Sequence, residues 1–440
     1  MKNMAHIIGF LILVQLLLVT PSFSQSLRYD SSDHGEPAGK APIVQPWAAV
    51  PLEQVYGGNW VVTGDLDRDG VIEIVSAKNH NENDVHFTSS VAVQDINGKL
   101  LWRWGNPTIG RRVWHHDVAC QIYDWDGDSW PEIVVATKAA IVELDGRTGH
   151  ERRRIAIPED ATDCIVFCNV SGNPRATDIM VKDRYHNIYV YNYSGELLWT
   201  VNDPGGYRTC HQPRPYDLDG DGRDEIFAGY SMLNHDGSLR WTISSEKAEI
   251  KNGHNDGVRL VKKGETPADW RFLLTYCGAN GLAYVDGNGA TIWEQTGFHY
   301  ESLNVGRVFP DVDGPQFLVD VDHVPKGESP VIVFDENGNR LSRLTSDYCR
   351  HHKLLDWSGN GLDEIILANA RGVFDKNGER IATLATDSPG EAMQMGDMTG
   401  DGVPDVGIVT PTAFFVFENK GGVKVDGEVK LGSIVNYTLY

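Results

Sequence analysis

Short apolar runs, separated by polar turns, recur along most of the chain and predict an all-β protein. The runs EIVVAT (132–137) and EIILAN (364–369) are typical. Each is short, rich in β-branched residues and bounded by turn residues, which favours strands over helices. No strong helical periodicity follows the first 24 residues.

A glycine turn closes many of these apolar pairs. Asn-Gly and Asp-Gly sequences between short apolar runs are a strong signal for β-hairpins. Eight copies start at Asp95, Asp145, Tyr193, Asp236, Asp286, Asp335, Asp375 and Asn419. Several turns are followed by Leu/Ile-Trp, namely at Trp102, Trp199, Trp241 and Trp293.

An acidic loop of the form Asp-x-Asp-x-Asp-Gly recurs in step with these turns. Clear copies start at Asp65, Asp124, Asp217, Asp356 and Asp397, and degenerate copies lie near Asn169 and Asp311. The interval predicts another degenerate copy near Asp256. A repeat of about 40 to 60 residues indicates a propeller or a linear array.

Each repeat corresponds to four short strands, with the acidic loop after the first strand and the glycine turn after the third. The prediction is an all-β fold: a single β-propeller of eight, alternatively seven, four-stranded blades. A solenoid fits less well, because its repeats are mostly shorter or helical. The acidic loops and glycine turns share one face of such a propeller. The connections between blades and the loops between strands two and three lie on the other face.

The N-terminus predicts three segments. Residues 1–24 have a basic start at Lys2, an apolar stretch and a small-residue cleavage pattern, as in a secretory signal peptide. A membrane anchor is the alternative, but a span needs roughly 20 apolar residues and this run is shorter. Residues 25–56 are rich in Pro and Gly and predict an extension that packs on the propeller of residues 57–440. The expected location is periplasmic or extracellular, with no membrane contact.

Composition narrows the partners. The formal net charge of −22 argues against nucleic-acid binding, which needs basic patches. The 12 Trp and 16 Tyr suit both β structure and stacking on sugar rings, whereas 6 Cys are too few for a disulfide scaffold. We expect a monomer.

The acidic loops resemble the start of calcium loops, because hard cations prefer several carboxylate and carbonyl oxygens and the Gly permits a sharp turn. The acidic ninth position distinguishes them from EF-hands. The alternative is that the Asp side chains cap their own turns. The expected structural Ca²⁺ ligands are Asp65, Asp67, Asp69 and Glu73; Asp124, Asp126, Asp128 and Glu132; and Asp217, Asp219, Asp221 and Glu225.

Histidines cluster in the connections that precede the innermost strands, in WHHD (114–117), CHQP (210–213), GHND (253–256), FHYE (298–301) and RHHK (350–353). They should converge on the central funnel, opposite the acidic loops. The candidate catalytic residues are His115, His116, Tyr207, Arg208, His211, His254, Arg350 and His351. The candidate substrate-binding residues are Lys78, Arg112, Arg184, Tyr185, Tyr300 and His352. The alternative is that individual histidines only bond neighbouring blades.

This set suits an acidic sugar. Arg binds carboxylates in a bidentate manner, aromatic rings stack on sugars, and His transfers protons near neutral pH. β-Elimination next to a uronate carboxylate needs a base and a cation for the developing charge. His115 or His116 would be the base, His211 or Tyr207 the acid, and Arg208 or Arg350 the cation. A weaker alternative is Zn²⁺ held by Cys277, Cys349, His254 and His351.

Three stretches carry a family resemblance: GDLDRDGVIEIV (64–75), DINGKLLWRW (95–104) and HHDVACQIYDWDGDSWPEIVVAT (115–137). They resemble the opening blades of family 11 rhamnogalacturonan lyases, which are eight-bladed, calcium-rich propellers that cleave a pectic glycan by β-elimination. The repeat style extends over about residues 57 to 425 and is shared with non-enzymatic FG-GAP-type propellers.

The leading hypothesis is therefore a secreted polysaccharide lyase acting on a uronate-containing, pectin-like glycan. One alternative is a non-catalytic propeller that binds a glycan or a protein. Another is a glycoside hydrolase with His-based catalysis, because no clear pair of carboxylates for ordinary glycoside hydrolysis is seen beyond Glu301 and Asp117.

Overall fold

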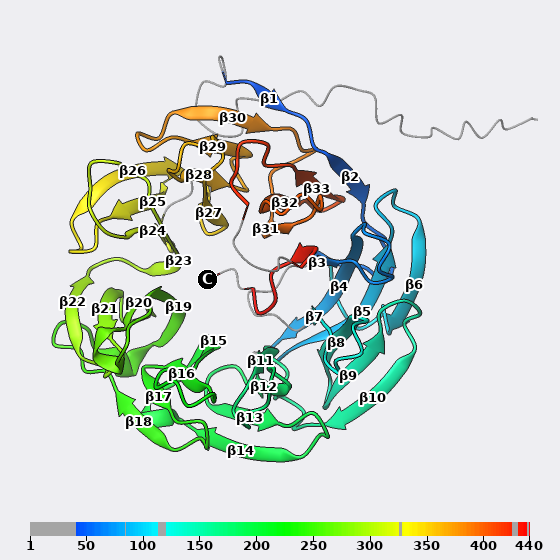
Figure 1. The fold of residues 1–440 in the computed structure, drawn as a ribbon, viewed down its shortest axis with the longest axis horizontal. Coiled ribbons are helices and arrows are strands. Elements are labelled where there is room, and N and C mark those ends of the chain that lie inside the picture. Colours follow the sequence, from blue (N-terminus) through cyan, green and yellow to red (C-terminus); the bar gives the residue numbers. More distant parts are fainter. Residues whose placement is uncertain (1–40, 84, 113–119, 325–327, 425–429, 438–439) are drawn as a thin grey trace, which may run out of the picture.

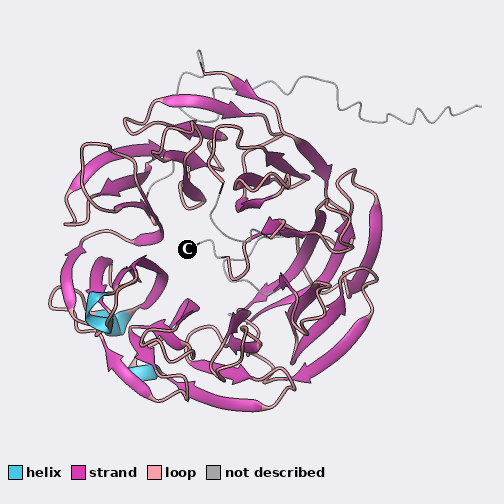
Figure 2. Ribbon diagram, viewed as in Figure 1, coloured by secondary structure: helices cyan, strands magenta, loops and turns pink. Residues whose placement is uncertain are grey.

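The regular secondary structure of the described residues is almost entirely β-strand (Figure 2). The computed structural model describes residues 41–83, 85–112, 120–324, 328–424, 430–437 and 440. Three short 3₁₀ turns interrupt the strands there: η2 (Pro204–Gly206), η3 (Ile250–Asn252) and η4 (Pro267–Asp269). None of the helical turns in these ranges is long and apolar enough to cross a membrane. The predicted signal segment lies outside the described residues.

Four-stranded antiparallel units surround a central axis, with the first strand of each unit innermost (Figure 1). The first two units consist of β3 (Trp60–Gly64), β4 (Glu73–Glu82), β5 (Val85–Gln94) and β6 (Leu100–Gly105), then β7 (Cys120–Tyr123), β8 (Glu132–Thr137), β9 (Ala140–Asp145) and β10 (Glu151–Ala156). The next two consist of β11 (Val166–Cys168), β12 (Asp178–Lys182), β13 (Asn187–Tyr191) and β14 (Leu197–Asn202), then β15 (Thr209–Tyr216), β16 (Glu225–Gly229), β17 (Ser231–Leu233) and β18 (Leu239–Thr242).

The arrangement continues through the second half of the chain. Two further units consist of β19 (His254–Lys262), β20 (Arg271–Cys277), β21 (Gly281–Asp286) and β22 (Thr291–Thr296), then β23 (Tyr300–Gly306), β24 (Gln316–Val321), β25 (Ser329–Phe334) and β26 (Arg340–Ser346). Next come β27 (His352–Leu355), β28 (Glu364–Leu367), β29 (Gly372–Phe374) and β30 (Arg380–Leu384), then β31 (Ala392–Asp397), β32 (Asp405–Val409) and β33 (Ala413–Phe417). The predicted all-β, propeller-like fold is confirmed.

The chain ends complete the ring. Strand β2 (Ala48–Pro51) pairs antiparallel with β33 and is the outermost strand of the last unit, while β1 (Ile43–Val44) pairs in parallel with β30. Strand β34 (Gly432–Ser433) pairs with both β3 and β31, so it joins the first and last units into one nine-stranded sheet. Part of the segment predicted as an N-terminal extension therefore supplies outer strands.

The repeated tryptophans link neighbouring units. The indole N–H of Trp102 donates to the carbonyl of Gly146 at 2.9 Å, and Trp241 repeats this contact with Gly287 at 3.0 Å. The next glycine turn packs on the ring face: Gly289 has a φ of 81°, and a Cβ there would lie 2.5 Å from Trp241. Only Gly combines that backbone conformation with so close an approach.

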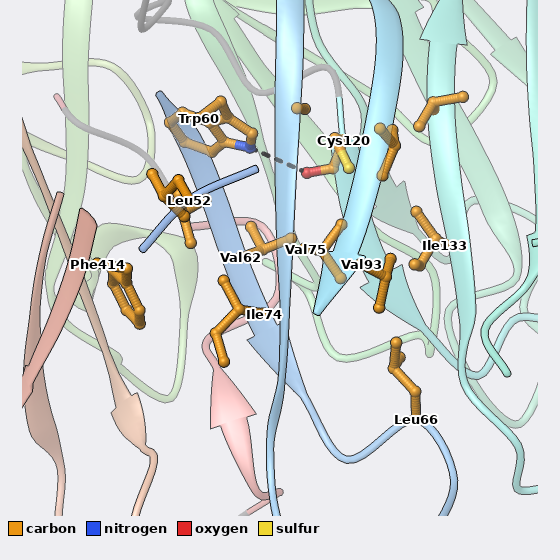
Figure 3. Packing of buried hydrophobic residues seen from close by; sticks show 14 of the residues in the cluster. Leu52, Trp60, Val62, Leu66, Ile74, Val75, Val93, Cys120, Ile133 and Phe414 are labelled. Carbon is orange, nitrogen blue, oxygen red and sulfur yellow. Dashed lines mark hydrogen bonds between the residues drawn. The ribbon is translucent and has the colours of Figure 1, made fainter. Parts of the chain in front are cut away.

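The hydrophobic core lies between the units. Figure 3 shows Trp60, Val75 and Val93 of the first unit facing Cys120 and Ile133 of the second. The indole N–H of Trp60 donates to the carbonyl of Cys120 at 3.3 Å. Because the alternate residues of each strand face a neighbouring sheet, the inner strands are buried on both sides.

The histidine connections and the acidic loops lie on opposite faces of the ring, as predicted. In β15, His211 lies near the first residue and the Asp217 loop follows the last, so the two occupy opposite ends of one strand. One repeat differs from the prediction. Asp256 does not start an acidic loop but lies inside β19, and the loop of that unit spans residues 263–270.

Candidate active site

Four of the predicted histidine connections lead into the innermost strands β15, β19, β23 and β27, which lie around the central axis (Figure 1). Side chains two residues apart on a strand share one face. His254 and Asp256 therefore point the same way, as do His299 and Glu301 in the next unit. This alternation brings ionisable groups of successive units into contact.

Two histidines and one aspartate form the centre of this site. The Nε2 atoms of His211 and His254 lie 3.0 Å apart. Oδ1 of Asp256 lies 3.2 Å from the former and 3.1 Å from the latter. All three side chains are buried. Their ligand atoms are close enough together to hold one metal ion.

Burial sets the charge of this group. Burial, followed by the nearby Arg184, lowers the pKa of His211 well below its usual value. Burial and the neighbouring His211 lower the pKa of His254 in the same direction. Burial and the charge of Glu301 raise the pKa of Asp256 well above its usual value. Both imidazoles are therefore neutral near pH 7.

The polar cluster continues into the adjacent unit. Sγ of Cys277 lies 3.2 Å from Nε2 of His299, and the same nitrogen lies 3.1 Å from Oε1 of Glu301. The exposed His323 stacks on His299 with ring centroids 4.0 Å apart. Cys349, the second cysteine of the zinc alternative, is buried, and its thiol donates to the carbonyl of Ser329 at 3.1 Å.

Arg350 is committed to carboxylates. Its Nη2 donates to Oε1 of Glu301 at 2.7 Å and also contacts Oδ2 of Asp322. Burial acts to lower the pKa of Arg350, but the Glu301 carboxylate raises it well above its usual value. This side chain is largely buried, so its predicted role as the free cation for a substrate is not favoured.

A second charged group is centred on Asp163. Asp163 is buried and accepts from Nδ1 of His86 at 2.5 Å and from Nζ of Lys182 at 3.0 Å. Burial acts to raise the pKa of Asp163, but Lys182 and Arg184 hold it well below its usual value. Asp163 and Lys182 were not predicted. Lys182 ends the buried strand DIMVK after three apolar residues, and that was the available signal.

Tyr185 lies between these two groups and is flanked by cations. The guanidinium carbons of Arg184 and Arg208 lie 5.1 Å and 5.5 Å from its ring centroid. The rings of Tyr185 and His254 are 4.5 Å apart. Arg208 is exposed, and no carboxylate lies within ion-pair distance of it among the residues that the structure describes. This is an accessible cationic and aromatic surface beside the histidine pair.

Several predicted residues lie elsewhere. Tyr300 and Tyr207 pack in hydrophobic clusters, the latter on Tyr230 with ring centroids 5.7 Å apart. His351 is buried beside Tyr348. His352 is buried as well, and its Nε2 lies 3.0 Å from the hydroxyl of Ser302. His115 and His116 lie outside the described residues.

Lys78 and Arg112 hold the segment that enters the ring. Lys78 donates to the carbonyls of Val55 and Pro107, the latter at 3.2 Å. Nη1 of Arg112 donates to the carbonyls of Glu53 and Gly57, each at 2.7 Å. Backbone carbonyls therefore compensate both positive charges, and neither side chain needs a substrate carboxylate as its partner.

The acidic loops share one internal geometry. Backbone N–H groups donate to the first Asp, as Gly70 does to Asp65 at 3.0 Å, and to the ninth-position Glu, as Leu66 does to Glu73 at 2.7 Å. Burial, followed by the nearby Asp67 and Asp65, raises the pKa of Glu73 to about 7. Asp65, Asp67 and Glu73 offer oxygens within reach of a single ion.

Two other loops receive an arginine from their own unit. Nη1 of Arg152 lies 2.7 Å from Glu132, and Nη1 of Arg240 lies 3.3 Å from Glu225. Strand register places Leu101 at the corresponding position of the first unit. The loop at Asp65 therefore lacks the arginine that the other two have.

Comparison with known proteins gives one curated relative. Rhamnogalacturonan endolyase YesW of Bacillus subtilis (strain 168) is 24% identical, over 51% of this chain and 47% of that protein. The chain thus spans about half the length of the curated relative it matches. No family model matches the chain.

Solved structures are similar over most of the chain. The Bacillus licheniformis rhamnogalacturonan lyase PL11 has a TM-score of 0.62 at 17% identity, covering 86% of this chain and 76% of that one. The V. cholerae biofilm matrix protein Bap1 has a TM-score of 0.58 at 12% identity, covering 87% and 91%. The chain is thus an all-β protein of propeller-like fold. Within that class it is similar to family 11 rhamnogalacturonan lyases, as its motifs predicted.

Proposed function

We propose that this protein is a secreted polysaccharide lyase that cleaves a uronate-containing, rhamnogalacturonan- or pectin-like glycan by β-elimination. The observation that supports it best is the surface formed by Arg184, Tyr185 and Arg208 next to two neutral histidines. An acidic sugar needs a cation for its carboxylate and a flat face for its ring. The similarity to rhamnogalacturonan lyases agrees with this substrate class.

In this reaction a base removes the proton α to the carboxylate, and the electron pair forms a carbon–carbon double bond as the glycosidic oxygen leaves with a proton. Arg208 is the cation in our proposal, because it is exposed while Arg350 is paired. Tyr185 suits the proton donor better than the buried His211, or than Tyr207, whose ring packs against Tyr230. His115 or His116 remains the proposed base.

The proposal includes the frame of the site. We assign the units to eight blades, closed by strands from both ends of the chain. The Asp65 loop is the proposed structural Ca²⁺ site, because its carboxylates are crowded and, among the described residues, no arginine pairs with them. In the Asp124 and Asp217 loops Arg152 and Arg240 already supply positive charge.

The test measures ultraviolet absorbance of the unsaturated uronate product on a panel of pectic and other uronate polymers. Wild type should produce it, and Arg208→Ala should lower kcat/KM by roughly 100-fold or more, as for lost charge stabilisation in other enzymes. Arg103→Ala is the matched control, because Arg103 also lies over a tyrosine ring, Tyr56, at 5.3 Å, but on an outer strand. Equal activity of the two variants would refute the role of Arg208.

The same panel distinguishes the alternatives. A non-catalytic propeller would bind a glycan saturably without forming product. A glycoside hydrolase would release reducing ends without the unsaturated product. Either outcome on every uronate polymer would overturn the proposed lyase activity.

A further inference from the structure

A cavity of about 510 Å³ lies among the innermost strands, farther along them than His211 and His254. Strands β15, β19, β23, β27 and β31 each contribute to its lining, in that order with Arg214, Arg259, Asn304, Lys353 and Met395. Residues 434–437, which follow β34, complete the wall. Small-molecule sites are typically cavities of about 300 to 1,000 Å³, so this one is large enough for a ligand.

Three cations line this cavity without an anionic partner. Nη1 of Arg214 donates to the carbonyl of Asn436 at 2.8 Å, and Nη1 of Arg259 donates to the carbonyl of its preceding residue at 3.0 Å. Nζ of Lys353 lies 4.7 Å from the ring centroid of Tyr437. Among the residues that the structure describes, no carboxylate lines the cavity or pairs with these cations. A guanidinium has five N–H donors and an ammonium group three, so most of these donors are available to a ligand.

The fold does not require positive charge at this level of the ring. Arg214 and Lys353 each stand three residues before the first Asp of an acidic loop. In three other units the same position is occupied by Val62, Gln121 and Gln394. Neutral side chains therefore satisfy this strand position, and the cations need another explanation.

The three charges also oppose one another. Burial, followed by the nearby Arg214, lowers the pKa of Arg259 to about 9. Burial, followed by Arg259 and Arg214, lowers the pKa of Lys353 well below its usual value. A buried charge without a compensating partner carries a large desolvation cost. A bound anion would supply the compensation that the protein itself lacks.

A neutral donor adds to this set. The hydroxyl of Tyr437, a lining residue, is buried and has no hydrogen-bond partner among the described residues. Its segment is held in place by Asn436, whose side chain accepts from the backbone N–H of Phe167 at 3.0 Å and donates to the carbonyl of the same residue at 2.9 Å. Donors that are fixed before binding reduce the entropy that a ligand complex loses.

We propose that this cavity binds one oxyanion, either a small inorganic ion such as sulfate or the carboxylate of an acidic sugar. Arg214, Arg259 and Lys353 hold its oxygens. Guanidinium groups match such planar or forked oxygen pairs, and the ammonium group adds a point charge. The cavity shares no lining residue with the surface formed by Arg184, Tyr185 and Arg208, so this inference does not depend on the proposed lyase activity.

The experiment is isothermal titration calorimetry on the full chain, in a calcium-containing buffer of low ionic strength near pH 7. Sodium sulfate and sodium galacturonate are the two probes, and sodium chloride and neutral galactose are their controls. Wild type should bind one oxyanion per chain. Lys353→Met and Arg259→Gln should each weaken binding by roughly 10- to 100-fold, because a hydrogen bond to a charged group contributes about that factor. Circular dichroism verifies that each variant folds, and if one does not, the other decides.

Lys430→Met is the matched control, because Lys430 lines a different cavity, of about 550 Å³, together with Asp65 and Asp124. It should bind the probes as wild type does. Sulfate binding alone would identify an inorganic oxyanion as the ligand, whereas binding of galacturonate but not galactose would identify a sugar carboxylate. No binding of either probe, or equal binding in wild type, Lys353→Met and Arg259→Gln, would overturn the proposal.

Discussion

Ionisable side chains lie at two levels along the innermost strands, and the two levels differ in how their buried charges are compensated. The His level, at the start of the innermost strands, consists of His211, His254, Asp256, Glu301 and Arg350. The basic level, three residues or so farther along the same strands, consists of Arg214, Arg259 and Lys353. A cavity of about 510 Å³ adjoins the basic level, and no carboxylate lines it.

Buried charges at the two levels have different partners. At the His level Arg350 contacts two carboxylates. At the basic level Arg214 donates to the carbonyl of Asn436 at 2.8 Å, and Nζ of Lys353 lies 4.7 Å from the ring centroid of Tyr437. A carbonyl dipole or an aromatic ring compensates a buried charge less than a carboxylate does. The first level should therefore stabilise the fold through its pairs, and the second should reduce its stability.

The largest effect is expected from Glu301→Gln. Breaking a buried ion pair by removing one partner leaves the other charge uncompensated and costs about 3 kcal/mol or more. Glu301 and Arg350 are both buried, so the free energy of unfolding from urea titration should fall by about 3 kcal/mol.

The matched control is Glu82→Gln, which removes an exposed pair with Arg111. It should cost less than about 1 kcal/mol. Equal losses in the two variants would mean that the pair at the His level is as solvated as a surface pair, and the contrast between the levels would fail.

The next effect has the opposite sign. Burial, followed by Arg259 and Arg214, lowers the pKa of Lys353 well below 10.5. Its charge therefore opposes folding, and Lys353→Met should raise the free energy of unfolding at pH 7 by about 1 to 2 kcal/mol. The gain should shrink as pH rises toward 10.5, because the folded wild type loses the proton there before the unfolded chain does.

Lys430→Met is the control for this variant, since Lys430 is exposed but also lies over a tyrosine ring, Tyr123, at 5.6 Å. It should change stability by less than about 0.5 kcal/mol. A Lys353→Met protein less stable than wild type would show that the ammonium group is well compensated.

The repeats made the fold predictable, because acidic loops, glycine turns and the following tryptophans are local signals of one four-stranded unit. The closing strand was not predictable. Residues 48–51 carry no strand pattern of their own, and their pairing with β33 joins positions far apart in sequence. The paths of Lys78 and Arg112 could not be predicted either, because both depend on where that N-terminal segment runs.

Strand alternation explains which of the predicted residues the structure brings together. In FHYE, His299 and Glu301 lie on one face and contact each other, while Tyr300 between them packs in the core. The same rule, applied to GHND, would have placed Asp256 beside His254 and removed it from the acidic loops. Asp163 shows the limit, because its partners His86 and Lys182 come from other strands and no local pattern joins them.

The smallest effect is expected from His352→Asn, and it concerns how stability depends on pH. Asn304 donates to Nδ1 of His352 at 3.1 Å, and burial lowers the pKa of this imidazole below 6.5. The unfolded chain takes up the proton first, so stability is lost as pH falls below about 6.5, by up to about 1.4 kcal/mol per pH unit for each such group. Between pH 7.5 and 5.5, His352→Asn should lose about 1 kcal/mol less than wild type in urea titrations.

The exposed His150→Asn should follow wild type. Identical pH slopes for all three proteins would mean that His352 is protonated in the folded state, whereas the stability gain of Lys353→Met at pH 7 would persist.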